Sequence, residues 1–307
     1  MRIAVTGASG FIGQHVAADL LARGEEVVPI RRPFERRGLA GQFAGATAVV
    51  HLAGLISAPR ERDFVAANVD ATRIVAEAAR EARVRMVHIS SLAAGGPAPA
   101  SAPRSETDPP HPITAYGRSK LAGERVLAET AGLRWIALRP GVVYGPRDRA
   151  LLALFRMAAR GVLPVVGRSG AAYTFIHVAD VVRAIAAAIR SDLDGDAIFV
   201  GHPQPVTPRA LVDGIRAAVA PEARVIRVPM PLTRAAALAG EIAQRVTGRP
   251  VLINESRYRE LAAEGFVCRV DRLRERLGVV AEVDLEDGLK TTGEWYRREG
   301  WLGSRSA

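Results

Sequence analysis

A glycine-rich turn near the start of the chain constrains the fold more than any other feature of the sequence. The apolar run Ile3–Thr6 is typical of a buried strand, and it leads directly into Gly7-Ala8-Ser9-Gly10-Phe11-Ile12-Gly13, where a helical pattern begins. In such a strand–turn–helix unit Gly7 permits the tight turn, Gly10 lets the backbone approach a pyrophosphate, and Gly13 allows close helix–strand packing. The motif predicts a dinucleotide-binding domain.

The rest of the first half repeats this alternation of short apolar runs and helical patterns. Further strands are predicted at Glu26–Ile30, Ala48–Leu52, Met86–Ser90 and Trp135–Arg139, with helices beginning at Phe11 and covering Glu61–Ala82 and Thr114–Thr130. A proline-rich loop, Gly95–Pro112, precedes the last of these helices and is either a plain connector or part of a substrate cleft. Alternating strands and helices form a parallel sheet covered on both faces, so we expect a Rossmann-type doubly wound α/β fold.

The second half is less regular and is predicted to form a smaller, mainly helical substrate-binding lobe. Helices are expected at Asp148–Arg160, Val178–Ile189, Pro208–Ala218, Leu232–Val246 and Leu285–Arg298. We place the dinucleotide-binding domain at residues 1–165, with residues 173–200 returning to it, and the interleaved substrate lobe at residues 166–307. The stretch Pro229–Val251 is apolar enough for a helix on a membrane surface, but a packed helix of the smaller lobe is the favoured interpretation.

Two arginines follow the second predicted strand, at the position that sets coenzyme preference. NAD-selective sites place a carboxylate here, about 20 residues beyond the glycines, where it binds the ribose 2′-hydroxyl. In this chain Arg31 and Arg32 follow Ile30, and no acidic residue occurs before Glu35. Guanidinium groups attract a 2′-phosphate that a carboxylate would repel. The sequence therefore predicts NADP rather than NAD, with two ordinary surface arginines as the alternative.

A Tyr-x-x-x-Lys pair supplies the candidate catalytic groups. Tyr116 and Lys120 are four residues apart, so both side chains project from one face of the predicted helix. A phenol has an ordinary pKa of about 10, and the ammonium of Lys120 would favour the phenolate, which makes Tyr116 the predicted general acid/base. Ser91 follows the fourth strand, at the end where parallel sheets bind ligands, and can donate to a substrate oxygen that gains negative charge. Ser90 fits a strand-end cap instead.

Several motifs, in this order along the chain, resemble the extended short-chain dehydrogenase/reductase family, the group called NAD-dependent epimerase/dehydratase. Besides the glycine turn they are His51-Leu52-Ala53-Gly54, Asn68, Ser90-Ser91, Tyr116 to Lys120, Arg139-Pro140 through Val143-Tyr144-Gly145-Pro146, and Phe175-Ile176-His177-Val178 with Asp180. The resemblance implies that Leu52 to Gly54 line the cofactor and that Pro140 to Val143 lie behind the nicotinamide. It also implies a homodimer that pairs through two helices, one of them carrying Tyr116.

The predicted site combines the motif residues with those that the resemblance adds. Ser91, Tyr116 and Lys120 are the predicted catalytic residues, and Lys120 also holds the nicotinamide ribose. The predicted cofactor-binding residues are Gly7, Gly10, Phe11, Ile12, Gly13, Arg31, Arg32, Leu52, Ala53, Gly54, Asn68, Tyr116, Lys120, Pro140 and Val143. One departure concerns adenine. The segment between Ile30 and Ala48 is too short for the family's usual extra strand and helix, so the acidic residue that commonly contacts adenine is predicted to be missing or displaced.

The residues after Ser91 separate the family's chemistries. Family dehydratases carry an Asp-Glu pair there, and enzymes that invert carbon centres by deprotonation carry a cysteine, whereas this chain has Leu92 and Ala93. That leaves NADP(H)-dependent hydride transfer with a ketone or secondary alcohol. The alternative is a nucleotide-sugar 4-epimerase, and a third class is a non-catalytic NADP-binding subunit. Tyr173, where nucleotide-sugar enzymes commonly carry a diphosphate-binding arginine, favours the reductase, although Arg168 could substitute.

Composition argues against several other classes. The net charge is +10, but the 42 basic residues include only two lysines and are scattered, so no nucleic-acid partner is expected. No apolar run approaches the roughly 18 residues that span a bilayer. The lone Cys268 allows no internal disulfide. His51, His88 and His177 are expected to be structural histidines with hydrogen-bond partners, and no metal site is predicted. We expect a cytoplasmic enzyme with a small-molecule substrate.

Overall fold

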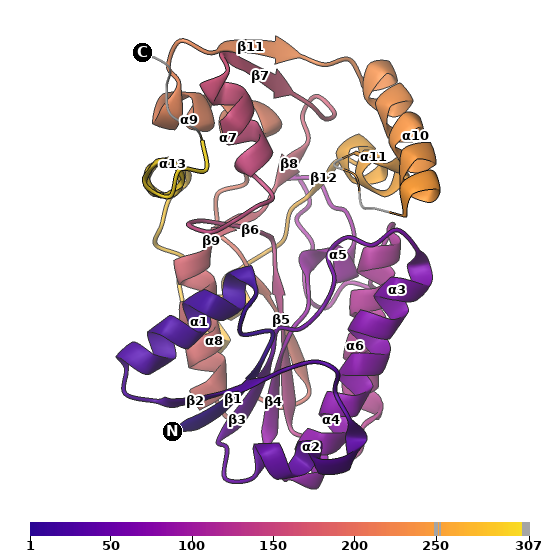
Figure 1. Ribbon diagram of the computed structural model, residues 1–307, viewed down its shortest axis with the longest axis vertical. Helices are drawn as coiled ribbons and strands as arrows, with labels where there is room; N and C mark the ends of the chain where they lie inside the picture. The colour runs from indigo at the N-terminus through magenta and orange to yellow at the C-terminus, as the bar shows by residue number, and fades with distance from the viewer. Residues whose placement is uncertain (249–250, 252, 303–307) are drawn as a thin grey trace.

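A six-stranded parallel sheet forms the centre of the protein, with its strands in the order β10-β5-β4-β3-β1-β2 (Figure 1). The computed structural model describes residues 1–248, 251 and 253–302. The strands are β1 (Arg2–Thr6), β2 (Glu26–Ile30), β3 (Ala48–His51), β4 (Arg85–Ile89), β5 (Trp135–Pro140) and β10 (Asp196–Val200). All neighbouring strands run parallel. The predicted doubly wound α/β fold is confirmed, and each of the five predicted strands agrees to within one residue at either end.

The two edges of the sheet differ from the sequence prediction in two details. The edge strand β10 was not predicted; it pairs with β5 from Asp196 opposite Ile136 to Val200 opposite Pro140. At the other edge the sheet ends at β2, as the short segment after Ile30 predicts. That segment contains a short kinked helix, α2 (Arg36–Phe43), and no further strand, so it holds only part of the family's usual strand and helix. The hydrophobic side chains Leu39 and Phe43 explain the helix, because both are buried against the sheet.

Helices cover both faces of the sheet because alternate strand residues point to opposite sides. Ile3 and Val5 pack with α1 (Phe11–Ala22) and α8 (Val178–Arg190). Ala4 and Val49 pack on the other face with α2, α4 (Ala71–Glu81) and α6 (Ala115–Glu129). The predicted helix Glu61–Ala82 is divided into α3 (Glu61–Val65), a π-helical turn η1 (Ala66–Asp70) and α4.

The second half of the chain adds a lobe with its own core. Its elements are β6 (Val142–Tyr144), α7 (Leu152–Ala159), β7 (Val162–Val165), β8 (Ala172–Tyr173), β9 (Phe175–His177), α9 (Pro208–Val219), β11 (Arg224–Arg227), α10 (Met230–Thr247), α11 (Glu255–Ala262), β12 (Gly265–Phe266), α12 (Asp271–Leu277) and α13 (Leu285–Arg298). Phe155, Ile215, Leu289 and Tyr296 are fully buried in this core. The helix predicted at Asp148–Arg160 begins at Leu152 instead, because the Asp148 carboxylate accepts hydrogen bonds from the N–H groups of Ala150 and Leu151. The boundaries proposed for the two domains stay predictions.

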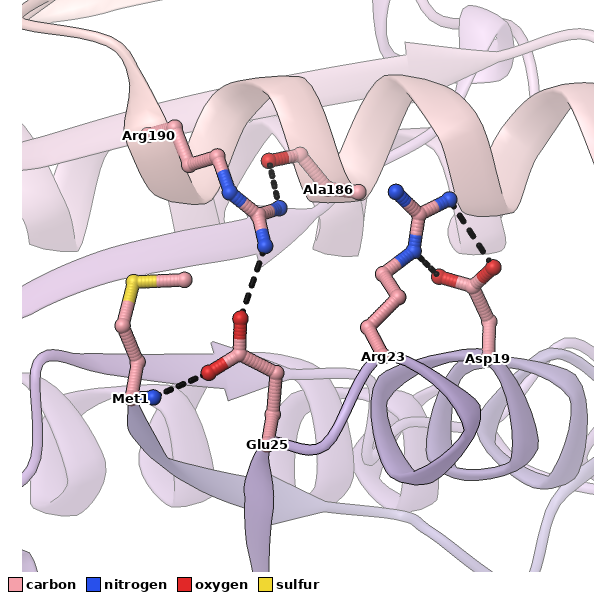
Figure 2. A network of polar contacts seen from close by, with 6 residues as sticks. All are labelled: Met1, Asp19, Arg23, Glu25, Ala186 and Arg190. Atoms are coloured by element: carbon pink, nitrogen blue, oxygen red, sulfur yellow. Dashed lines mark hydrogen bonds and ion pairs between the residues drawn. The ribbon is translucent and has the colours of Figure 1, made fainter.

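A network of polar contacts joins the start of the chain to the end of α8 (Figure 2). The Met1 ammonium and Arg190 bind the same carboxylate, that of Glu25, which immediately precedes β2; the Arg190 contact measures 2.8 Å. Arg190 also donates to the carbonyl of Ala186 at 3.1 Å. These contacts hold the end of α8 against the amino ends of the strands. Ligands bind at the carboxyl ends of the strands in open parallel sheets, so we expect the functional residues there.

Candidate active site

The turn between β1 and α1 has the close backbone contacts that its glycines predict. Gly7 has a left-handed φ of +71°, and a Cβ there would lie 2.8 Å from the backbone nitrogen of Ala53. At Gly13 a Cβ would lie 2.1 Å from the carbonyl oxygen of Gly7, so only glycine lets α1 pack this closely. Gly10 is the N-cap of α1, and no described side chain caps the helix. The first N–H groups of α1 can therefore bind an anion, which fits a dinucleotide pyrophosphate.

Other predicted cofactor-binding residues lie around this turn and at the carboxyl end of the sheet. Phe11 and Ile12 open α1. Ile12, Leu52 and Val143 are half-buried and pack against the core of the α1 face. Pro140 is buried at the end of β5. The structure brings these residues to the same edge of the sheet as Gly7; their contact with a cofactor stays a prediction.

Asn68 connects the loop after β3 to helix α6. It is buried in η1, where its side-chain oxygen accepts from the N–H of Leu55 at 2.8 Å and its amide donates to the Leu55 carbonyl at 2.9 Å. The same amide donates to the hydroxyl of Ser119 at 2.9 Å. A Cβ at Gly54 would lie 2.8 Å from the Asn68 side-chain oxygen and 3.8 Å from Nζ of Lys120. The fold thus gathers Gly54, Asn68 and Lys120, as the motifs predict.

The two predicted catalytic hydroxyl groups lie near each other beyond the end of β4. Tyr116 lies in the first turn of α6, and its ring contacts that of Phe64 with centroids 6.1 Å apart. Ser91 caps the short helix α5 (Leu92–Gly95) and accepts from the N–H of Ala93 at 3.1 Å. Burial raises the pKa of Tyr116, and a hydrogen bond with Ser91 opposes this rise. The phenol of Tyr116 is therefore protonated at neutral pH and can act as a proton donor.

Lys120 lies one helical turn after Tyr116 and is buried. Its ammonium donates to the carbonyl oxygen of Ile89, at the end of β4, at 2.5 Å. Burial lowers the pKa of Lys120 to about 8, and the carboxylate of Glu124 opposes that effect. The amine is therefore mainly charged at neutral pH and lies away from bulk solvent.

The expected electrostatic coupling between Lys120 and Tyr116 is not seen in this arrangement. Burial has the largest effect on the pKa of Tyr116; Ser91, Glu260 and Arg257 are the described residues that modify it. The Lys120 ammonium is directed to the Ile89 carbonyl instead. The i, i+4 spacing puts two side chains on one face of a helix, but it does not decide which acceptor the longer chain reaches.

Glu124 extends the row of Tyr116 and Lys120 by one more turn and was missed by the sequence analysis. Its carboxylate accepts from Nε and Nη2 of Arg139 at 2.9 and 2.6 Å. The hydroxyl of Ser90 donates to the same carboxylate, so Ser90 bonds a side chain rather than capping its strand. Both charged side chains are at most 10% exposed. The i, i+4, i+8 spacing along α6 was the signal that could have identified Glu124.

Two of the three histidines that we expected to have hydrogen-bond partners lack a partner on at least one ring nitrogen among the described residues. His51 has partners on both ring nitrogens, with Thr6 at 2.7 Å and Thr72 at 3.1 Å. Its ring stacks on that of His88, with centroids 5.4 Å apart. His88 is buried, and neither ring nitrogen has a partner among the described residues; Nε2 of His177 also lacks one. The prediction is wrong for His88 because the packing of α6 on β4 encloses its ring without supplying a polar group.

The His51–His88 pair predicts an acid-sensitive stability. Burial lowers the pKa of His51 to about 3 and that of His88 well below its ordinary value. In the unfolded chain both rings take up a proton near pH 6.5, so stability is retained above that pH and falls as the pH drops from about 6.5 toward the folded-state values. Each ring should contribute a slope of about 1.4 kcal/mol per pH unit. Denaturant unfolding at pH 7.5, 6 and 5 measures this.

A His88→Phe variant should remove one of these two protons and so reduce the slope below pH 6 by about 1.4 kcal/mol per pH unit. The exposed His111 provides the control, because His111→Asn should leave the slope unchanged. A slope for His88→Phe equal to that of the wild type would contradict the assignment.

Arg31 and Arg32 have different environments although they are adjacent. Arg32 donates to the carbonyl of Ala67 at 3.4 Å, and its guanidinium lies 5.7 Å from the ring centroid of Phe34. Arg31 is exposed, and its side chain forms no hydrogen bond or ion pair with the part of the chain that the structure describes. Arg31 is therefore the guanidinium free to bind an anion beyond β2.

Tyr173 packs against an apolar cluster that includes Leu92 and Phe266. Tyr173 stacks on Phe266, with centroids 6.5 Å apart, and its hydroxyl donates to the Glu260 carbonyl at 3.4 Å. Arg168 lies 3.7 Å from the carboxylate of Glu264. The side chain that could have replaced the missing diphosphate ligand is thus paired elsewhere.

The proline-rich loop Gly95–Pro112 is held against the second lobe. Ala98 forms a β-bridge with Phe266, and Arg104 forms one with Cys268. The guanidinium of Arg104 donates to two carbonyls of its own loop at 3.0 and 3.1 Å. The loop is thus more than a plain connector; its contact with substrate stays a prediction.

Comparisons with known proteins agree with this arrangement. Residues 3–201 match the model of the NAD-dependent epimerase/dehydratase family. The chain belongs to this family. The extended short-chain dehydrogenase/reductase resemblance is thereby confirmed, and the family's Rossmann-type sheet accounts for the glycine turn and the Tyr116 helix.

Individual relatives of this family member carry out different reactions. A ceramide reductase of Caulobacter vibrioides is 30% identical over 98% of this chain and 96% of its own length. A 4-hydroxy-2-methyl-3-oxo-4-farnesyl-3,4-dihydroquinoline-1-oxide ketoreductase of Stigmatella aurantiaca is 29% identical over 94% of this chain and 95% of its own. The solved UDP-glucose 4-epimerase of Thermus thermophilus, in complex with NAD, is 26% identical with a TM-score of 0.76, covering 97% of this chain and 99% of its own.

Proposed function

We propose that the protein is an NADP(H)-dependent reductase of an apolar, lipid-like ketone, or a dehydrogenase of the corresponding secondary alcohol. The juxtaposition of Tyr116 and Ser91, in a fold that also has a dinucleotide-type glycine turn, carries this proposal. The apolar residues beside them, and the ceramide reductase and farnesylated-quinoline ketoreductase among the relatives, support the substrate class. Leu92 and Ala93 offer no acid or base for eliminating water.

Each residue of the site has one task in this proposal. Bound NADPH would supply the hydride. The free N–H groups at the start of α1 would hold the pyrophosphate, and Lys120 would hold the ribose hydroxyls beside Gly54. Ser91 donates a hydrogen bond to the substrate carbonyl, and Tyr116 delivers its phenolic proton to the oxygen as it becomes an alcohol. The raised pKa of Tyr116 suits a group that must be protonated when reduction begins.

A ketone panel tests the proposal directly. Oxidation of NADPH followed at its absorbance band should be observed with long-chain or polycyclic ketones and not with UDP-glucose. The absence of turnover with every ketone, with coenzyme still bound, would instead support a non-catalytic NADP-binding subunit.

The 4-epimerase remains the second candidate because solved epimerases share the fold along nearly the whole chain. Arg257 is the described cation that influences Tyr116 electrostatically, and it could contact a diphosphate. It pairs with Glu260 at 2.9 Å, however, which reduces its availability. Purified protein that retains NAD and interconverts UDP-glucose and UDP-galactose without added coenzyme would establish this alternative.

Coenzyme preference should depend on Arg31. Removing it in Arg31→Ala should lower kcat/KM for NADPH by roughly 10- to 100-fold, the range expected for a charge-assisted hydrogen bond, and leave the value for NADH nearly unchanged. Steady-state kinetics with both coenzymes measures the ratio. Arg36 is a nearby control, since it already pairs with Glu77 at 3.0 Å and Arg36→Ala should not alter the ratio. Equal losses with both coenzymes would argue against a 2′-phosphate contact.

We also propose a cytoplasmic homodimer that pairs through α6 and its neighbour α4. The family resemblance supports it, and sedimentation velocity would measure the association.

A further inference from the structure

Helix α10 presents its apolar residues outward, in the reverse of the usual arrangement for a surface helix. Leu232, Leu238, Ile242 and Val246 are 63%, 50%, 64% and 81% exposed. Alanines at positions 235, 236, 239 and 243 are also exposed and continue the same face at helical spacing. We call these eight residues the α10 outer face. It carries no charged side chain.

Small and polar residues attach α10 to the rest of the protein. Thr233, Ala237 and Gln244 are its buried residues. A Cβ at Gly240 would lie 2.0 Å from the carbonyl oxygen of Ile253, so the helix sits very close to the segment before α11. The Gln244 amide donates to the Pro59 carbonyl at 3.4 Å. The apolar side chains of α10 are therefore not needed to hold the helix in place.

Arginines accompany the α10 outer face. From Arg224 through Gly248 the chain has four arginines, Arg224 included, and a single acidic residue, Glu241. Arg245 pairs with that glutamate at 3.3 Å. Arg227 and Arg234 are exposed, and within the described residues neither side chain has a hydrogen bond or ion pair. An apolar face with uncompensated guanidinium groups beside it is the combination that binds an anionic bilayer surface.

Helix α10 itself lies near elements that surround the candidate active site. In Figure 1, α10 and α11 lie side by side above α3. Helix α11 carries Arg257 and Glu260, whose charges act on Tyr116, and α3 carries Phe64, whose ring contacts that of Tyr116. The loop that ends at Pro59 contains Ile56, another exposed hydrophobic residue. A surface bound to α10 would therefore lie near the elements that surround the catalytic phenol.

We propose that the α10 outer face docks the protein peripherally on a bilayer containing anionic phospholipids. Leu232, Leu238, Ile242 and Val246 would insert at the boundary between headgroups and acyl chains, while Arg227 and Arg234 bind lipid phosphates. None of the helices in the described part of the chain has the length and hydropathy needed to cross a bilayer, so α10 would lie in the membrane plane. The idea that the membrane presents a lipid-like ketone to Tyr116 rests on the proposed function. The docking of α10 on the bilayer does not depend on that function.

Flotation of the full-length protein with vesicles tests the docking. We expect the wild type to float with vesicles of phosphatidylcholine and phosphatidylglycerol, and much less with phosphatidylcholine alone. Leu238→Glu/Ile242→Glu should reduce the bound fraction roughly tenfold or more, because each large aliphatic side chain removed from the lipid contributes about that factor. Arg227→Gln/Arg234→Gln should remove the preference for anionic vesicles.

A matched control separates docking from general hydrophobicity. Leu21 and Val280 are 60% and 49% exposed but lie on other elements, so Leu21→Glu/Val280→Glu should bind vesicles like the wild type. Circular dichroism melts should show that both double variants fold, since all four side chains are exposed.

Several outcomes would overturn the proposal. A wild type that fails to float, or a Leu238→Glu/Ile242→Glu variant that floats as well as the wild type, contradicts docking. A wild type that binds no vesicles and forms a dimer, which this variant converts to a monomer, would instead make the α10 outer face a protein interface. Flotation uses no turnover. Vesicle binding without ketone reduction would therefore uphold the docking and count against the proposed function.

Discussion

Tyr116→Phe is expected to reduce kcat for carbonyl reduction by about 10²- to 10⁴-fold, the range typical of a lost general acid. The variant keeps the ring that contacts Phe64 and removes only the hydroxyl near Ser91. Coenzyme binding should change little, because the pyrophosphate site at the start of α1 is untouched. Steady-state kinetics combined with coenzyme titration by protein fluorescence separates the two effects.

Tyr173 provides the matched control for this experiment. Its ring also packs on an aromatic neighbour, and among the described residues its hydroxyl makes a single long hydrogen bond, 3.4 Å to the Glu260 carbonyl. Tyr173→Phe should therefore keep kcat within a few-fold of the wild type. A Tyr116→Phe enzyme as active as the Tyr173→Phe enzyme would remove Tyr116 from the mechanism.

Glu124→Leu is expected to lower the free energy of unfolding by about 3–5 kcal/mol, because it leaves the buried guanidinium of Arg139 without a counter-charge. Denaturant unfolding measures the loss. The same change should lower the pKa of Lys120 further, since Glu124 is the charge that opposes the effect of burial there. The pH profile of kcat/KM should then shift toward acid, which a purely structural role would not produce.

The double variant Glu124→Leu/Arg139→Met tests whether the loss comes from the unpaired charge. Replacing both partners with apolar side chains should restore most of the stability, because the desolvation cost of the pair is removed together with its attraction. A double variant as unstable as Glu124→Leu would mean that the loss comes from packing and not from charge.

Local patterns predicted the sheet well because buried parallel strands are short apolar runs between turns. Ala48–His51 and Arg85–Ile89 are such runs, buried along their whole length. The strand β10 was not predicted because Asp196 at its start resembles loop sequence, and its position in the sheet depends on pairing with β5. The helix α2 was not predicted because Arg37 and Gly38 interrupt the helical pattern with non-helical backbone angles.

The candidate site was predictable where one segment supplies the residues. The glycine turn and the Tyr116–Lys120 pair are of this kind. The spacing along α6 places Glu124 in line with Tyr116 and Lys120, but it does not predict burial, because a charged helical residue is ordinarily solvated. Its burial depends on Arg139, which a different strand supplies. The hydrogen bond from Lys120 to Ile89 likewise depends on how α6 packs on β4.

The π-helical turn at Ala66–Asp70 has a consequence for how such a site can change. A π-helical turn corresponds to one residue inserted into an α-helix. Deleting one residue here would let α3 and α4 join as a continuous helix, rotate Phe64 away from the Tyr116 ring, and displace the Asn68 amide that holds Leu55. Chain length therefore helps to set the geometry of the site, because loss of a single codon would move Phe64 and Asn68 without substituting either residue.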